Sequence, residues 1–411
     1  MRGSTLHTED TRRHENAAVR AHDRGVVLTE LCSFLFASLP RADQRRKGVE
    51  YLRGLLEAEG RKSIRNIARL IGGRATEQNL HHFISSSTWD WGPVRETLAN
   101  HLVRVAPPQA WVVRPTVIPK TGEHSVGVDR RFIPSLGQVL NAQQAIGVWS
   151  TSDEVSMPVN WRLHLSQAWL DDVPRRKQVS IPESVNAQTL GACAVETLLE
   201  PLSAWRLPVR PVVMDAREMD AMRIVRRLRA AGLPFVVRVD STVPLCPAES
   251  APAGHSADAL PAQQILDVSR NLRRPVMWTD HGGQPGLRTS LVAGVRVRVP
   301  SPGRRLTLPG RRAAGGEEDL LLLGAGTQGR RWPREFWLTD RTAVPPALPF
   351  RLSRLTRRVD QDFTEIADKV GIRDFAGRSF DGWHRHVTLA SAAHAVVALA
   401  RTGDRQLRCA S

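Results

Sequence analysis

The part of the sequence that most constrains the fold is residues 211–239, PVVMDAREMDAMRIVRRLRAAGLPFVVRV. The apolar run at 211–214 predicts a buried strand that ends at Asp215. A helical pattern follows over 217–231, and FVVRV at 235–239 predicts a second buried strand. Two strands joined through a helix lie parallel in one sheet, so this stretch predicts a β–α–β unit.

Three consecutive strands joined by turns are expected upstream of this unit. They read WVVRPTVIP (111–119), HSVGVDRRF (124–132) and QQAIGVWS (143–150), and PVNWRLHL (158–165) extends the same sheet. Three antiparallel strands followed by a parallel crossover is the strand order of an RNase H-like sheet. We therefore predict an α/β fold with an RNase H-like core. Functional groups in open sheets gather at the carboxyl ends of strands, which makes Asp215 a candidate.

The remaining sequence divides into regions around this core. Apolar residues recur at helical spacing before residue 106, and short β-like runs such as DLLLL and EFWLT follow residue 241. The predicted regions are a disordered tail (1–24), a helical DNA-binding region (25–106), the first half of the core (107–240), a β-rich insertion (241–350), the closing helices of the core (351–400) and a tail (401–411).

The charge of the chain favours a polyanionic partner. Lysine and arginine number 58 against 41 aspartates and glutamates, which gives a net charge of +17. Nucleic acid is the expected partner, although an arginine-rich composition also arises in GC-rich genomes. No apolar run is long enough for a membrane helix, and the first 25 residues lack the apolar region of a secretory signal. We therefore expect a cytoplasmic, nucleoid-associated protein without a membrane partner.

The strongest local concentration of positive charge runs from Arg41 to Arg74. Within it, the stripe Ile64, Ile67 and Ile71 is broken by Gly72-Gly73, a spacing that resembles a helix–turn–helix. The alternative is a plain helical bundle with a solvated basic face. The candidate DNA-binding residues are Arg61, Lys62, Arg65, Arg69 and Arg74 here, with Lys120 and His124 in the turn after the first strand of the core.

Several motifs in a fixed order resemble insertion-sequence transposases of the DDE class. The motifs are KTGEHSVGV (120–128), Asn-Ala-Gln (141–143), PVNWRLHL, RRKQVSIPE (175–183) and GRSFDGWHRHVTLASAAHAVVALA (377–400). The resemblance covers roughly residues 60–400. It implies an RNase H-like catalytic core that cuts and joins double-stranded DNA at the ends of an element. It also implies Mg²⁺ held by three acidic side chains, and a homodimer is an assembly to test.

The acidic residues that the resemblance implies are incomplete in this chain. The second acid falls on Asp215, and the third falls on Asp360, where the family usually has glutamate. The first acid should precede KTG by about six residues, and Arg114-Pro115 stands there. Asp129 is a candidate substitute if 111–119 and 124–132 form a hairpin that places it opposite Thr116.

Alternatives to Asp360 are Asp362 and Glu365, which lie close by in the same helical segment. Arginine in place of the first acid exchanges a metal ligand for a cation, and it could pair with Asp215 or Asp360 as an internal counter-ion. Two hypotheses follow. The chain is either a metal-dependent DNA transposase, impaired by the missing ligand, or a catalytically inactive descendant that still binds DNA. An unrelated RNA-binding or structural protein is the remaining alternative.

Overall fold

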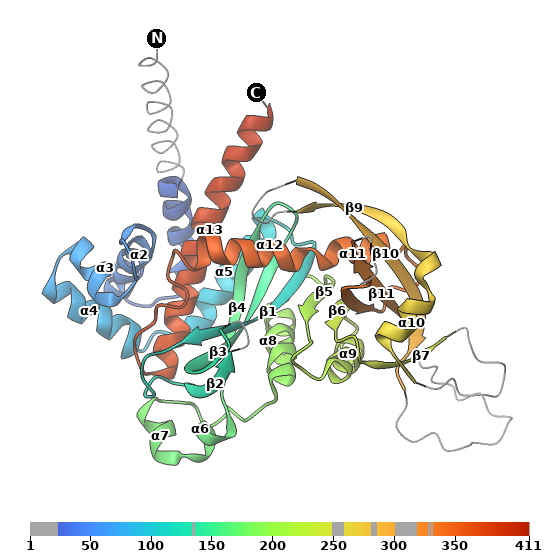
Figure 1. Cartoon of the computed structure of the whole chain (residues 1–411). Coiled ribbons are helices and arrows are strands. Elements are labelled where there is room, and N and C mark those ends of the chain that lie inside the picture. The colour runs from blue at the N-terminus through green and yellow to red at the C-terminus, as the bar shows by residue number, and fades with distance from the viewer. Residues whose placement is uncertain are drawn as a thin grey trace, which may run out of the picture.

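The computed structural model describes residues 24–133, 136–248, 259–280, 286–300, 319–327, 329 and 332–410. The tail predicted over 1–24 falls almost wholly outside these residues, and so does the short β-like run RRLTL at 304–308. The described part forms a mixed α/β structure in which one large sheet is covered by helices (Figure 1).

The centre of the sheet is formed by five strands in the order β4-β3-β1-β5-β6. Strands β3 and β1 are antiparallel, whereas β5 and β6 run parallel to β1 and to each other. The bounds are Ala110–Pro119 for β1, Gln138–Thr151 for β3, Ser156–His164 for β4, Val212–Asp215 for β5 and Phe235–Val239 for β6.

The predicted β–α–β unit is present, with helix α9 (Ala221–Ala230) between β5 and β6. Helix α9 begins where the Asp220 side chain accepts a hydrogen bond from the Arg223 backbone N–H. Three of its residues that lie on one face of the helix, Ile224, Val225 and Leu228, are buried. The apolar spacing at every third and fourth residue thus fixes which face of α9 is buried.

The hairpin predicted between residues 111–119 and 124–132 is wrong. Strand β2 is short, Asp129–Ile133, and it pairs with β3, while β1 also pairs with β3 along its whole length. Residues 124–128, predicted as the first part of the second strand, belong to the loop after β1, and in this loop the Val126 backbone N–H donates to Arg378 O at 3.2 Å.

Strands from the region predicted as an insertion continue the same sheet beyond β6. Strand β12 pairs with β6, β11 with β12, and β10 with β11, all antiparallel. The bounds are Pro244–Pro247 for β7, Leu260–Pro261 for β8, Arg274–Asp280 for β9, Gly286–Arg298 for β10, Leu320–Gly326 for β11 and Glu335–Thr339 for β12. Helix α10 (Ala262–Val268) packs beside β10.

The N-terminal region is helical, as its apolar spacing predicts. A helix over 24–35 is followed by α2 (Ala42–Glu57), α3 (Ile64–Ile71), α4 (Arg74–Ser85) and α5 (Trp91–Val105). Gly72 and Gly73 separate α3 from α4, as expected. Helix α13 (Phe380–Ala410) contacts α2, α4, α5 and strand β4, so it joins this region to the sheet (Figure 1).

Helix α13 is longer than predicted. The sequence predicted a tail over 401–411, whereas the helix continues to Ala410. No proline follows residue 400, and RQLR at 405–408 consists of residues that favour helix.

The other helices complete the cover of the sheet. They are α6 (Gln167–Asp171), α7 (Val173–Gln178), α8 (Leu190–Ala204), α11 (Ala347–Ser353) and α12 (Leu355–Asp362), with a π-helical turn at Phe363–Ala367. Helix α12 lies across the sheet and packs against β1, β3, β4 and β5 (Figure 1). Among the described helices, none is both long and apolar enough to cross a membrane.

Candidate active site and its arginines

Three charged residues lie side by side on the central strands of the sheet. Val113 of β1 is paired with Met214 of β5, so the next residue of each strand sets Arg114 beside Asp215. Asp215 is in turn paired with Arg238 of β6. Neighbouring residues in parallel strands point to the same face of a sheet. The strands therefore present a row of cation, carboxylate and cation.

Asp215 is held by two arginines. Its carboxylate accepts hydrogen bonds from Arg217 Nε at 2.9 Å and from Arg217 Nη2 at 2.7 Å, and Arg238 Nη1 lies 3.4 Å from its Oδ2. These hydrogen bonds raise the pKa of Arg217 above its usual value. Asp215 ends its strand as predicted, but its oxygens are already engaged by guanidinium groups.

Asp360 is held by the arginine that stands in place of the first acid. Arg114 Nε donates to Asp360 Oδ1 at 2.9 Å, which joins strand β1 to helix α12. The Arg114 guanidinium also donates to the Thr116 hydroxyl at 2.8 Å and lies over the Phe363 ring, 3.9 Å from its centroid. Arg114 is therefore fixed from three sides.

The site carries more positive than negative charge. Arg114, Arg217 and Arg238 face two carboxylates, those of Asp215 and Asp360. A divalent cation needs several carboxylate oxygens that are free to coordinate it. Among the described residues, no group of three or more His, Cys, Asp or Glu side chains could hold a metal ion. The side chains present do not fit the Mg²⁺ that the resemblance implies.

Asp129 lies away from this site. It is paired with Ala142 of β3 and forms an ion pair with Arg131 at 3.2 Å. The β3 partner of Arg114 is Gly147, five residues farther along β3, which is about 17 Å of strand. Asp129 was expected to face Thr116 across a hairpin, and without that hairpin it does not approach Arg114.

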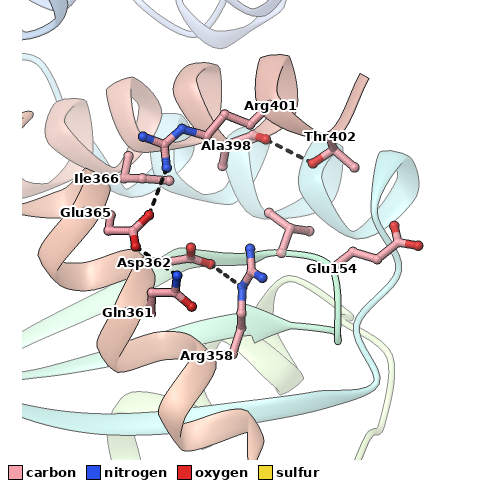
Figure 2. Close-up of a pocket in the computed structure, with 10 residues that line it drawn as sticks. Glu154, Arg358, Gln361, Asp362, Glu365, Ile366, Ala398, Arg401 and Thr402 are labelled. Atoms are coloured by element: carbon pink, nitrogen blue, oxygen red, sulfur yellow. Dashed lines mark hydrogen bonds and ion pairs between the residues drawn. The ribbon is translucent and has the colours of Figure 1, made fainter. Parts of the chain in front are cut away.

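Asp362 and Glu365 do not join Asp360 either. Figure 2 shows Asp362 directed at Arg358 and Glu365 directed at Gln361, near the C-terminal part of α13. Asp362 Oδ2 accepts from Arg358 Nε at 2.8 Å and also from the backbone and hydroxyl of Ser156. Residues two apart on a helix do not face each other, so these hydrogen bonds belong to a different face of the helical segment.

The sequence reasoning missed Arg217 and Arg238. Arg238 is the only charged residue in the strand FVVRV, and a charged side chain in a buried strand predicts a partner. Arg217 follows Asp215 by only two residues, so its side chain is within reach of that carboxylate. Both signals were visible, but only the pairing of β5 with β6 shows that the two arginines converge on one carboxylate.

The ion pair of Arg238 and Asp215 lies near a second ion pair, that of Glu335 and Arg354. Glu335 of β12 binds Arg354 of the α11–α12 junction, and its charge also acts on Arg238. Burial alone would raise the pKa of Glu335, but hydrogen bonds and charge from Arg354 lower it to about 2. The charges of the site are thus connected to the strands that extend the sheet.

Most of the candidate DNA-binding residues are accessible. Arg61, Arg65, Arg69, Arg74 and His124 are exposed, and Lys120 is partly buried. Lys62 differs, because its side chain is buried and its ammonium donates to Ala58 O. The Lys62 ammonium is therefore engaged at the end of α2, unlike the exposed arginines of this group.

The family model described as DDE superfamily endonuclease matches residues 34–283, which include α2 to α5 and the central strands. No curated protein matches the chain.

Proposed function

Because this chain belongs to the DDE superfamily of endonucleases, we propose that it is a transposase-derived protein that binds double-stranded DNA without cleaving it. The family implies a DNA substrate. The net charge of +17 and the exposed arginines of α3 and α4 are consistent with such a substrate. The order β4-β3-β1-β5-β6 supports an RNase H-like core for the region around Asp215.

The proposal that cleavage is lost rests on the ion pair between Arg114 and Asp360. A guanidinium stays charged at any usable pH, so Arg114 cannot be neutralised to admit a metal ion. It holds one of the two remaining acidic residues at 2.9 Å, while Arg217 and Arg238 hold the other. Both carboxylates of the site are thus engaged by guanidinium groups.

The test is to measure DNA binding and DNA cleavage on the same preparation. The substrate is a labelled duplex carrying the sequences that flank the gene, with Mg²⁺ or Mn²⁺ present. We expect binding that weakens steeply with salt, and no cleavage. Robust cleavage by the unmodified chain that Asp215→Ala abolishes would overturn the proposal and favour an active transposase.

Two further aspects of the proposal concern assembly and location. A homodimer would hold two DNA ends together, and association with the nucleoid would follow from binding to DNA. Sedimentation of the protein with and without the same duplex tests the homodimer. A homodimer predicts that each complex contains two chains. Fluorescence microscopy of a tagged chain tests whether it co-localises with the nucleoid.

A further inference from the structure

A polar cavity of about 380 Å³ lies where three distant parts of the chain meet. The parts are Arg61 in the loop between α2 and α3, the end of β1 with the loop that follows it, and the segment before α13. The lining residues used below are Arg61, Lys120, Thr121, Ser125, Arg373 and Asp374.

Hydrogen bonds between these segments fix the wall of the cavity. The Lys62 backbone N–H donates to Asp374 Oδ2 at 2.8 Å, which ties the α2–α3 loop to the segment before α13. Lys120 Nζ donates to Phe375 O at 2.6 Å, and the Lys120 backbone N–H donates to Asn141 O at 2.8 Å. The cavity is therefore preformed, which lowers the cost of ordering a ligand site.

The cavity carries an excess of positive charge. Arg61 and Lys120 face a single carboxylate, that of Asp374, and Arg61 Nε lies 3.8 Å from Asp374 Oδ1. Arg373 adds a third cation, although its charge is shared with Asp368 through two hydrogen bonds of 2.7 and 2.6 Å. An anion of modest size would balance the remaining charge.

Lys120 is the most sensitive of these cations to its surroundings. Burial and, to a smaller extent, the charge of Arg61 lower the pKa of Lys120, while the charge of Asp374 opposes them, and the pKa that results is about 8. A bound anion would favour the charged ammonium. The hydroxyl groups of Thr121 and Ser125 on the same wall can donate hydrogen bonds to the same ligand.

One aromatic ring, that of Phe363, contacts both the arginine-filled site and a residue that lines the cavity. The ring of Phe363 lies under Arg114 on one side, at 3.9 Å, and near Arg373 on the other, at 5.6 Å. Arg373 therefore stands between Arg114 and the cavity, while Arg61 connects the cavity to the helical region that follows α2. Arg114, Arg373 and Arg61 thus place positive groups at successive points between the sheet and the helical region.

From this placement we propose that the cavity binds one phosphodiester group of a DNA strand that runs between the helical region and the Arg114 site. Arg61, Lys120 and Arg373 neutralise the phosphate, and the hydroxyl groups of Thr121 and Ser125 orient it. The proposal rests on the DNA binding proposed above. It assigns a single contact point to that binding, whereas a diffuse basic surface would have none.

Two matched variants test this site. The side chains of Arg61 and Arg53 are each 59% exposed, and each has one loosely placed carboxylate, at 3.8 and 4.0 Å. Arg53 belongs to α2 and does not line the cavity. Binding of a fluorescein-labelled duplex is followed by anisotropy over a range of KCl concentrations for wild type, Arg61→Ala and Arg53→Ala.

We expect Arg61→Ala to weaken binding at least fivefold near 0.1 M salt and to reduce the slope of log K against log salt by about 0.9. Arg53→Ala should change neither quantity by more than experimental error. Equal losses in the two variants would overturn the phosphate site, since they would indicate a diffuse basic surface. A wild-type chain that does not bind DNA at all would instead refute the proposed function.

Discussion

Arg114→Asp should restore divalent-ion binding at the site in β1. The change replaces a cation by a carboxylate and releases Asp360 from its ion pair. For a divalent ion about 8 Å away in a medium with the dielectric constant of water, the reversal of one charge is worth about 2 kcal/mol. That free energy corresponds to about thirtyfold in Kd. Arg114→Ala removes the cation only, so it should give about half of this free energy.

The measurement is calorimetric titration of Mn²⁺ into the wild type and the variants. It is made at about 10 mM ionic strength, where the Debye length of about 30 Å leaves the interaction nearly unscreened. The double variant Arg114→Asp with Asp215→Ala should lose most of the gain, because it has only two carboxylates at the site, the same number as the wild type. The reasoning is refuted if wild type and Arg114→Asp bind Mn²⁺ equally well. Since Arg217 and Arg238 remain on Asp215, we expect at most partial recovery of DNA cleavage.

Three other perturbations test the charges described here. Arg354 holds the pKa of Glu335 at about 2 instead of 4.5. Above pH 4.5 the Glu335 carboxylate therefore adds about 3 kcal/mol to the free energy of unfolding, and this contribution is lost as the pH falls towards 2. Urea unfolding should therefore show Glu335→Gln less stable than wild type at pH 7 but not near pH 2; equal stability at pH 7 would contradict this. Asp362→Ala leaves a buried arginine without its partner and should cost about 3–5 kcal/mol in the same assay, whereas Asp360→Ala, whose side chain is 63% exposed, should cost less than about 1 kcal/mol; similar losses would argue against the difference in burial. Since the pKa of Lys120 is about 8, its ammonium is lost as the pH rises from 7 to 9, and DNA affinity should fall with it; Lys120→Arg, which keeps its charge, should flatten that profile in anisotropy measurements.

The parts of the fold that depend on local pattern could be predicted from the sequence. The spacing of Ala221, Val225 and Leu228 in α9, and the apolar runs on either side of it, predicted the β–α–β unit. The break at Gly72-Gly73 likewise marked the boundary between two helices. In each case the signal lies within a few residues of the feature it predicts.

Features that depend on long-range pairing could not be predicted in this way. The predicted hairpin that would have contained Asp129 does not form, because β1 pairs with β3 instead. The alternation of apolar residues in a strand does not determine which strand it pairs with. The sequence identified Arg114 and named Asp360 as one of two partners for it. Only the packing of α12 on the sheet selects Asp360 and leaves Asp215 to Arg217 and Arg238.

Strand β12 pairs with the edge of strand β6 that would otherwise be open to pairing with other chains. Residues 235–239, FVVRV, pair with β5 on one side and with β12 on the other, and most of their side chains are buried. Without β12, the strand would present unpaired N–H and C=O groups along an apolar edge, which is a template for aggregation. A shortened chain that joins β6 directly to α11 would expose this edge, so we expect it to precipitate even though every central strand is retained.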